Sequence, residues 1–98
     1  MVKPFKVNIS DQIIKDIYDK VKKYPWSNIQ DMDGWEHGTN YKYLKDISRY
    51  WITKFNWRKQ EKKINKFCNY LTKVEGINLH FIKEKGSGSN PMPLLILH

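Results

Sequence analysis

The first part of the chain repeats apolar residues at the spacing of an amphipathic helix. The side chain of Ser10 is suited to cap the first turn, and Asp11 places a negative charge where the helix dipole favours it. Pro25 disfavours helical backbone at Tyr24, so this helix must end before the proline. We also expect ion pairs from Asp16 and Asp19 to the lysines four residues later, Lys20 and Lys23. The apolar stripe consists of Ile13, Ile14, Ile17, Tyr18 and Val21.

Two more helices are predicted before residue 69. Either Thr39 or Asn40 can cap the second helix, and Asn56 can cap the third. Residues 25–40 have no hydrophobic period but contain two Trp, so we expect this loop to be packed. The apolar residues expected to face inward are Tyr43, Leu44, Ile47, Tyr50, Trp51 and Phe55 in the second helix, and Trp57, Ile64, Phe67 and Cys68 in the third.

The hydrophobic period changes at Leu71. Residues 71–75 and 77–83 are short, rich in β-branched and aromatic residues, and separated at Gly76, which is typical of a β-hairpin. Residues 85–90 (KGSGSN) predict a flexible loop. Residues 93–98 form an apolar run typical of a strand that is buried on both faces and needs neighbouring strands.

Together these elements predict a truncated α/β fold. About three helices form a mainly α segment over residues 1–67, and residues 68–98 supply a hairpin, the loop and the first buried strand of a larger sheet. Nothing after His98 can supply the neighbours of that strand. We therefore expect the chain to be the front end of a larger protein.

The charge of the chain keeps a second hypothesis open. The 98 residues carry a net charge of +8, and their Lys are spread along the whole length, as on a solvated surface. The alternative is a free-standing basic module that binds nucleic acid or an acidic membrane surface. We expect its binding to nucleic acid to be non-specific and to weaken steeply with salt. The densest basic cluster contains Arg58, Lys59, Lys62, Lys63 and Lys66.

No segment of the sequence predicts a membrane anchor or a signal peptide. No apolar run is long enough to span a bilayer, and Lys and Asp interrupt every apolar stretch within residues 1–24. We therefore expect a protein that is cytoplasmic or peripheral to a membrane.

Few residues have a pattern typical of catalysis or ligand binding. Asp31, Asp33 and Glu36 form a carboxylate cluster, but the ligand spacing of an EF-hand is missing. Ser87 lies between two glycines, but the segment leads into a strand, whereas a nucleophile elbow leads into a helix. The residues themselves therefore predict no metal site and no cofactor.

The remaining Cys and His residues have structural interpretations. Cys68 is the single cysteine, which leaves no disulfide framework, and we expect it to be a small core residue. His37 is expected to be packed or exposed in its loop. His80, between Leu79 and Phe81, is expected to be hydrogen-bonded on a face of the sheet.

Five segments, in order and with matching spacing, resemble the N-terminal region of microsomal-type epoxide hydrolases, including the juvenile hormone epoxide hydrolases. Two positions depart from that pattern: Cys68 replaces a usual Pro, and Asn56 replaces a common Asp. The segments are P-F-K-V with S-D at residues 4–11, W-x-x-G-T-x-x-x-Y-L at residues 35–44, Y-W…F-N-W-R-x-Q-E…N at residues 50–65, E-G-I-x-L-H-F at residues 75–81, and the strand before H-G-x-P at residues 93–98.

The resemblance implies an α/β-hydrolase preceded by a helical segment. In such enzymes an Asp attacks an epoxide carbon and forms an ester, a His–acid pair activates the water that hydrolyses it, and lid Tyr hydroxyls donate to the epoxide oxygen. All of these groups would follow residue 98, so the resemblance implies a scaffold without catalytic residues that is inactive alone.

The resemblance also implies what the chain would contact. Its partner would be the remainder of the hydrolase body, and only the full-length enzyme would bind the epoxide substrate, without a cofactor. His98 resembles the first residue of H-G-x-P, where the backbone helps to form the oxyanion hole, and the resemblance places Gly-x-Pro directly after it.

Overall fold

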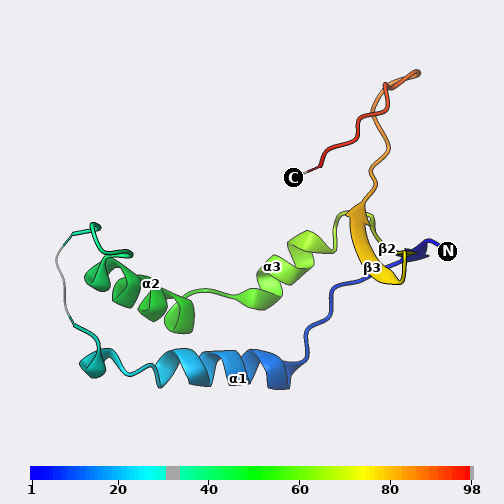
Figure 1. Ribbon diagram of the computed structural model, residues 1–98. Helices are drawn as coiled ribbons and strands as arrows, with labels where there is room; N and C mark the ends of the chain where they lie inside the picture. The colour runs from blue at the N-terminus through cyan, green and yellow to red at the C-terminus, as the bar shows by residue number, and fades with distance from the viewer. Residues whose placement is uncertain (31–33, 98) are drawn as a thin grey trace. The chain divides into compact units, whose positions relative to one another are not determined.

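The computed structural model describes residues 1–30 and 34–97, and within them it contains three α-helices and a three-stranded antiparallel sheet (Figure 1). The three predicted helices and the predicted hairpin are confirmed. The chain forms two compact units, one of residues 8–60 and one that combines residues 1–7 with the chain from residue 61 onward. The elements are β1 (Lys3–Pro4), α1 (Asp11–Lys22), the 3-10 helix η1 (Trp26–Asn28), α2 (Tyr41–Thr53), α3 (Trp57–Ile64), β2 (Asn69–Val74) and β3 (Ile77–Ile82).

Side-chain caps start all three helices. Ser10 Oγ accepts a hydrogen bond from the backbone N–H of Ile13 at 3.2 Å, as predicted for α1. Of the two candidates for α2, Asn40 is the cap, and its Oδ1 accepts from the N–H of Tyr43 at 2.9 Å. Asn56 caps α3 by accepting from the N–H of Lys59 at 3.0 Å.

The ion pair on the outer face of α1 differs from the prediction. Lys15 Nζ lies 2.5 Å from Asp19 Oδ2, in place of the expected pairs Asp16–Lys20 and Asp19–Lys23. Asp19 can reach the lysine one turn before it or the one after it, and it holds the former. The hydrogen bond from Lys15 lowers the pKa of the Asp19 carboxyl below its ordinary value.

A third strand joins the predicted hairpin. The strand order is β1-β2-β3, with Lys3 opposite Leu71 and Pro4 opposite Tyr70. This third strand was not among the elements predicted from the sequence. Its pairing with β2 ties the start of the chain to the sheet.

The hairpin closes through a two-residue turn. Val74 pairs with Ile77, so only Glu75 and Gly76 lie between the strands. Both have positive φ, 50° and 83°, which is the backbone of a type I′ turn. Gly adopts this region without strain, which explains why the predicted turn forms at Gly76.

Two asparagine side chains connect the end of α3 to the strands. Asn65 Oδ1 accepts from the N–H of Val7, and Asn65 Nδ2 donates to the carbonyl of Val7, both at 2.8 Å. The side-chain amide thus pairs with the backbone after β1 in the way a neighbouring strand would.

Asn69 is buried, with 4% of its surface exposed, and it makes three hydrogen bonds. Its Nδ2 donates to the carbonyls of Ile64 at 2.9 Å and Phe67 at 2.8 Å, and its Oδ1 lies 2.9 Å from His80 Nε2. Because Nδ2 is committed to two acceptors, Oδ1 must accept, so His80 carries a proton on Nε2. His80 is hydrogen-bonded on a sheet face, as expected.

The apolar residues that the sequence placed in a core are not buried within this chain. Among the described residues no hydrophobic side chain is buried, and the side chains of Trp51 and Phe67 are 40% and 53% exposed. Cys68, expected to be a core residue, is also exposed. Each helix has an apolar stripe, but a chain this short provides too little opposing surface to cover them all.

The strand predicted over residues 93–98 is not confirmed within this chain. Residues 93–97 join no strand and leave the three-stranded sheet (Figure 1), while His98 lies outside the described residues. The side chains of Leu94, Leu95, Ile96 and Leu97 are 78–83% exposed. Such a strand is buried only between partner strands and covering helices. The predicted division between residues 67 and 68 stays a prediction.

We expect Gly76→Ala to lower the free energy of unfolding by about 1 kcal/mol, because a Cβ is unfavourable at positive φ. The new Cβ would meet no atom within 4 Å, so the cost is purely conformational. Gly76→Asn is the matched control, since Asn tolerates this region. Urea unfolding followed by circular dichroism compares the two, and an equal loss in both would contradict the turn assignment.

We expect Asn69→Ala to lower the free energy of unfolding by about 2 kcal/mol, because it removes a buried amide that donates to two backbone carbonyls. Asn78→Ala removes the same kind of side chain from an exposed position of β3 and should change the value by less than about 0.5 kcal/mol. Equal effects of the two substitutions in urea unfolding would show that the amide of Asn69 has no special role.

Candidate docking faces and an aromatic pocket

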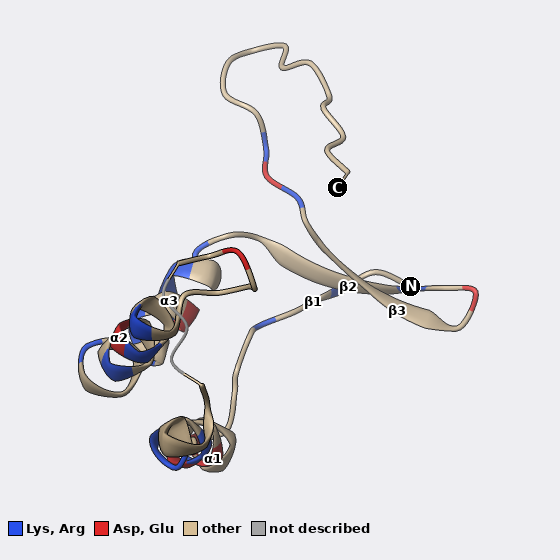
Figure 2. Cartoon of the chain, turned by 60° about the vertical axis from the view of Figure 1, so that its left-hand side comes forward, with Lys and Arg blue, Asp and Glu red and all other residues tan. Residues whose placement is uncertain are grey.

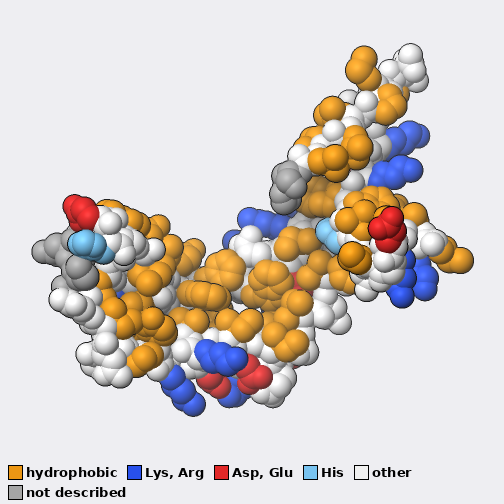
Figure 3. All heavy atoms as spheres, in the orientation of Figure 1, with side chains coloured by type: hydrophobic (Ala, Val, Ile, Leu, Met, Phe, Trp, Pro, Cys, Tyr) orange, Lys and Arg blue, Asp and Glu red, His pale blue; other side chains and the backbone are white. Residues whose placement is uncertain are grey.

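The helical unit of residues 8–60 leaves one side of each long helix apolar and exposed. On α2, Tyr43, Ile47 and Tyr50 follow one another at intervals of four and three residues, so they share a face, and all three are exposed. Ile13 and Ile17 do the same on α1. Figure 3 shows hydrophobic side chains over much of the visible surface of this unit. This is the kind of surface that another layer of structure covers.

The unit is nevertheless fixed internally. The hydroxyl of Tyr18 on α1 donates to the carbonyl of Phe55 after α2 at 2.8 Å. The two helices therefore present their exposed apolar residues from a defined arrangement.

One face of the sheet is also apolar and open. The register pairs Tyr70 of β2 with Phe81 of β3, so these two side chains and those at every second position along both strands lie on one face. The two rings stack with centroids 5.5 Å apart. Further along that face, Val74, Ile77 and Leu79 are each more than half exposed.

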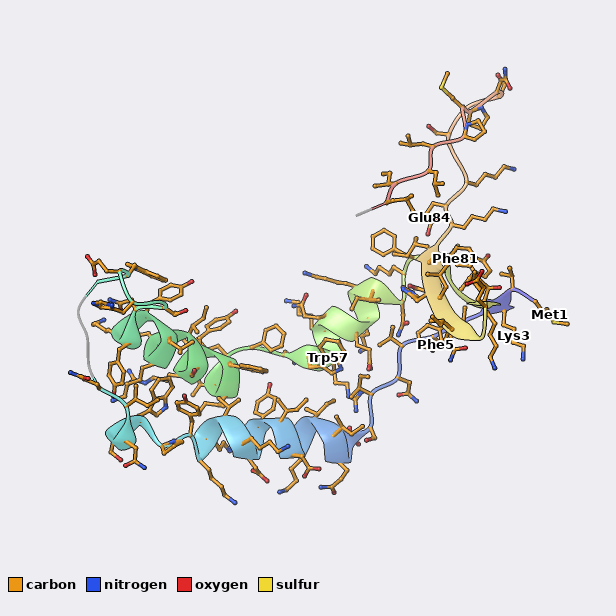
Figure 4. All side chains as sticks on the ribbon, viewed as in Figure 1. Met1, Lys3, Phe5, Trp57, Phe81 and Glu84 are labelled. Atoms are coloured by element: carbon orange, nitrogen blue, oxygen red, sulfur yellow. The ribbon has the colours of Figure 1, made fainter. Side chains whose placement is uncertain are left out.

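The opposite face of the sheet is more polar and partly covered. Phe5, which continues from β1, lies against the hairpin (Figure 4), with its ring 5.7 Å from that of His80 in an edge-on contact. Beyond β3, the Glu84 carboxylate accepts from the N–H of Cys68 at 2.6 Å. This hydrogen bond joins the chain just before β2 to the chain just after β3.

An aromatic cluster lies in the helical unit, around Trp26 of η1. The ring of Tyr24 is 4.7 Å from that of Trp26, and the ring of Tyr41 is 5.6 Å from it, both in edge-on geometry. The hydroxyl of Tyr41 also donates to the carbonyl of Trp26 at 3.2 Å. The second tryptophan of this region, Trp35, contacts Tyr43 at 5.3 Å and remains 59% exposed.

These rings border an open pocket of about 230 Å³. The sequence predicted that the loop with two Trp would be packed, which holds in part for Trp26 but not for the exposed Trp35. It did not predict a pocket. The sequence signal that could have indicated a pocket is Tyr24-Pro25-Trp26, followed later in the chain by two glycines, Gly34 and Gly38. The lining residues are Tyr24, Trp26, Ile29, Gln30, Gly34, His37, Gly38, Thr39, Tyr41 and Leu44.

Lys and Arg residues occur along all three helices (Figure 2). Arg58, the first residue of the densest basic cluster, is engaged within its own unit. Its guanidinium donates to the carbonyl of Ile9 at 2.7 Å and pairs with the carboxylate of Asp11. On α2, the hydrogen bond from Lys42 lowers the pKa of the Asp46 carboxyl. These contacts reduce the positive charge that is available to an anionic partner.

Among the described residues, those singled out for chemistry are not brought together. Asp31, Asp33 and His98 lie outside the described residues. Within the described part of the chain, no three His, Cys, Asp or Glu side chains are placed to hold a metal ion. Ser87 lies in an exposed bend that leads into extended chain. His37 contributes to the pocket lining.

None of the helices in the described part of the chain is long and apolar enough to cross a bilayer.

The sequence of residues 2–98 matches the protein family described as "Epoxide hydrolase N terminus". Epoxide hydrolase 1 of Sus scrofa is 38% identical to the chain over 99% of its length, and the juvenile hormone epoxide hydrolase of Manduca sexta is 32% identical over 99%. The chain spans 22% of the length of each of these relatives.

Solved structures show the same fold. The crystal structure of juvenile hormone epoxide hydrolase from Bombyx mori superposes with a TM-score of 0.76 at 25% identity, over 84% of this chain and 20% of that chain. The Aspergillus niger epoxide hydrolase superposes with a TM-score of 0.72 at 24% identity, over 84% of this chain and 22% of that chain.

Proposed function

Because the chain belongs to the epoxide hydrolase N-terminus family, we propose that it is the N-terminal scaffold of an epoxide hydrolase. In this role the α/β-hydrolase body covers the apolar faces of α1, α2 and the hairpin. The chain supplies structure to the enzyme and no reacting group.

The observation that carries this proposal is the exposure of the apolar residues. Hydrophobic residues make up 40% of the sequence, yet none is buried among the described residues 1–30 and 34–97. Burying one large aliphatic side chain stabilises a protein by about 1.5–3 kcal/mol, so a body that covers these faces would add to the stability of the segment. The small share of each relative that the chain spans agrees with such a role.

The complete enzyme would open epoxides to diols through an ester on an Asp nucleophile. Its nucleophile, its His–acid pair and its lid tyrosines would lie in the body. The segment that ends at His98 would lead into the oxyanion turn, where backbone N–H groups face the developing charge.

The alternative, a basic module for nucleic acid or an acidic membrane surface, has weaker support. Its densest cluster begins with Arg58, which is already paired with Asp11. Peripheral membrane association and an absence of specific nucleic-acid binding remain predictions from the sequence.

A hybrid enzyme tests the scaffold role. This chain would replace the matching N-terminal fifth of the Bombyx mori juvenile hormone epoxide hydrolase. We expect a soluble hybrid that hydrolyses an epoxide substrate. Ile47→Gln should lower its free energy of unfolding by about 2 kcal/mol, because an apolar residue covered by the body becomes polar.

Arg49→Gln is the matched control on the same helix, and we expect it to leave stability within about 0.5 kcal/mol of the unsubstituted hybrid. Thermal melting and epoxide turnover measure both variants. If the hybrid with Ile47→Gln is as stable as the hybrid with Arg49→Gln, the body does not cover this face of α2.

We expect the 98-residue chain alone to hydrolyse no epoxide, because ester formation and hydrolysis need a positioned carboxylate and an activated water. Diol formation from styrene oxide, compared with a boiled sample, measures this. Turnover clearly above the boiled sample would place catalytic groups within the chain.

A further inference from the structure

We propose that the pocket beside Trp26 binds a small neutral aromatic molecule of the phenol or indole class. The site lies entirely within the helical unit of residues 8–60, and the proposal does not depend on the scaffold role.

The walls of the pocket favour an aromatic ring. Trp26 and Tyr41 meet edge-on at 86°, so a third ring in the pocket beside them can contact the face of one and the edge of the other. Ile29 and Leu44 add aliphatic surface to the lining. The hydrogen bond from the Tyr41 hydroxyl to the Trp26 backbone carbonyl holds the two residues in this arrangement in the absence of a ligand.

The volume fits a ligand of this size. A cavity of roughly 150 Å³ is enough for benzene in a protein interior. The pocket here has about 230 Å³, which leaves room for a hydroxyl group or a second fused ring. Gln30, His37 and Thr39 in the lining provide hydrogen-bond donors and acceptors for such a polar group.

The charges nearby disfavour an aromatic cation. Lys45 Nζ lies 5.6 Å from the centre of the Tyr41 ring, so its ammonium group already makes the cation–π interaction that this ring can offer. A second cation would meet both this ammonium group and the net positive charge of the chain. A neutral ring avoids this repulsion.

The test is a titration of the full 98-residue chain with phenol, followed by NMR at the indole N–H groups. The chain has four tryptophans, so Trp35, Trp51 and Trp57 serve as controls in the same sample as Trp26. Cyclohexanol has a similar size without aromaticity, and phenyltrimethylammonium adds a positive charge to the ring. Single Trp→Phe variants assign the four signals.

We expect phenol to shift the Trp26 signal with a Kd on the order of 1–10 mM, as for a ligand with few atoms. Cyclohexanol and phenyltrimethylammonium should bind more weakly by about tenfold. Tyr41→Leu should weaken phenol binding by up to about tenfold, while Tyr43→Leu, which alters a ring outside the lining, should not.

Three results with the unsubstituted chain would overturn the proposal. Equal shifts at all four tryptophans would show general adsorption. Cyclohexanol or the cation binding as tightly as phenol would exclude the proposed class of ligand. No shift at Trp26 would show that the chain does not form a binding pocket there.

Discussion

Hydrogen bonds from side-chain amides to the backbone are the interactions on which the order of this chain depends. No described hydrophobic residue is buried, so the sheet and the end of α3 are not joined by an apolar core. Asn65 instead pairs with both backbone groups of Val7, and Asn69 bridges two carbonyls and His80. Each such bond contributes only about 0.5–1.5 kcal/mol, yet leaving a buried partner unpaired costs more.

Hydrogen bonds from polar side chains to the backbone also order the helical unit. Ser10, Asn40 and Asn56 satisfy N–H groups at the helix starts, and Tyr18 joins α1 to the chain after α2. These polar contacts set the geometry without using the apolar stripes. The stripes are therefore left for another surface, which is why the scaffold role in an epoxide hydrolase follows more naturally than a self-sufficient domain.

The aromatic pocket belongs to a different class of feature from the docking faces. The faces are broad and exposed, whereas Tyr24 and Tyr41 each contact Trp26, and the three rings line an open pocket. Rings that already meet in fixed geometry lose little freedom when a further ring binds, and this preorganisation favours selective binding of a small ring.

The sequence by itself determined the local structure and the family. Helix caps, the turn at Gly76 and the ordered motifs of residues 35–65 depend on near neighbours in the chain, so they could be predicted. Tertiary structure alone decided the pairing of β1, because it joins positions far apart, as do Val7 and Asn65, which are 58 residues apart. Tertiary structure also decided that the apolar stripe around Trp51 stays uncovered. A hydrophobic period in the sequence shows which face of a helix is apolar, but it does not show which surface covers that face.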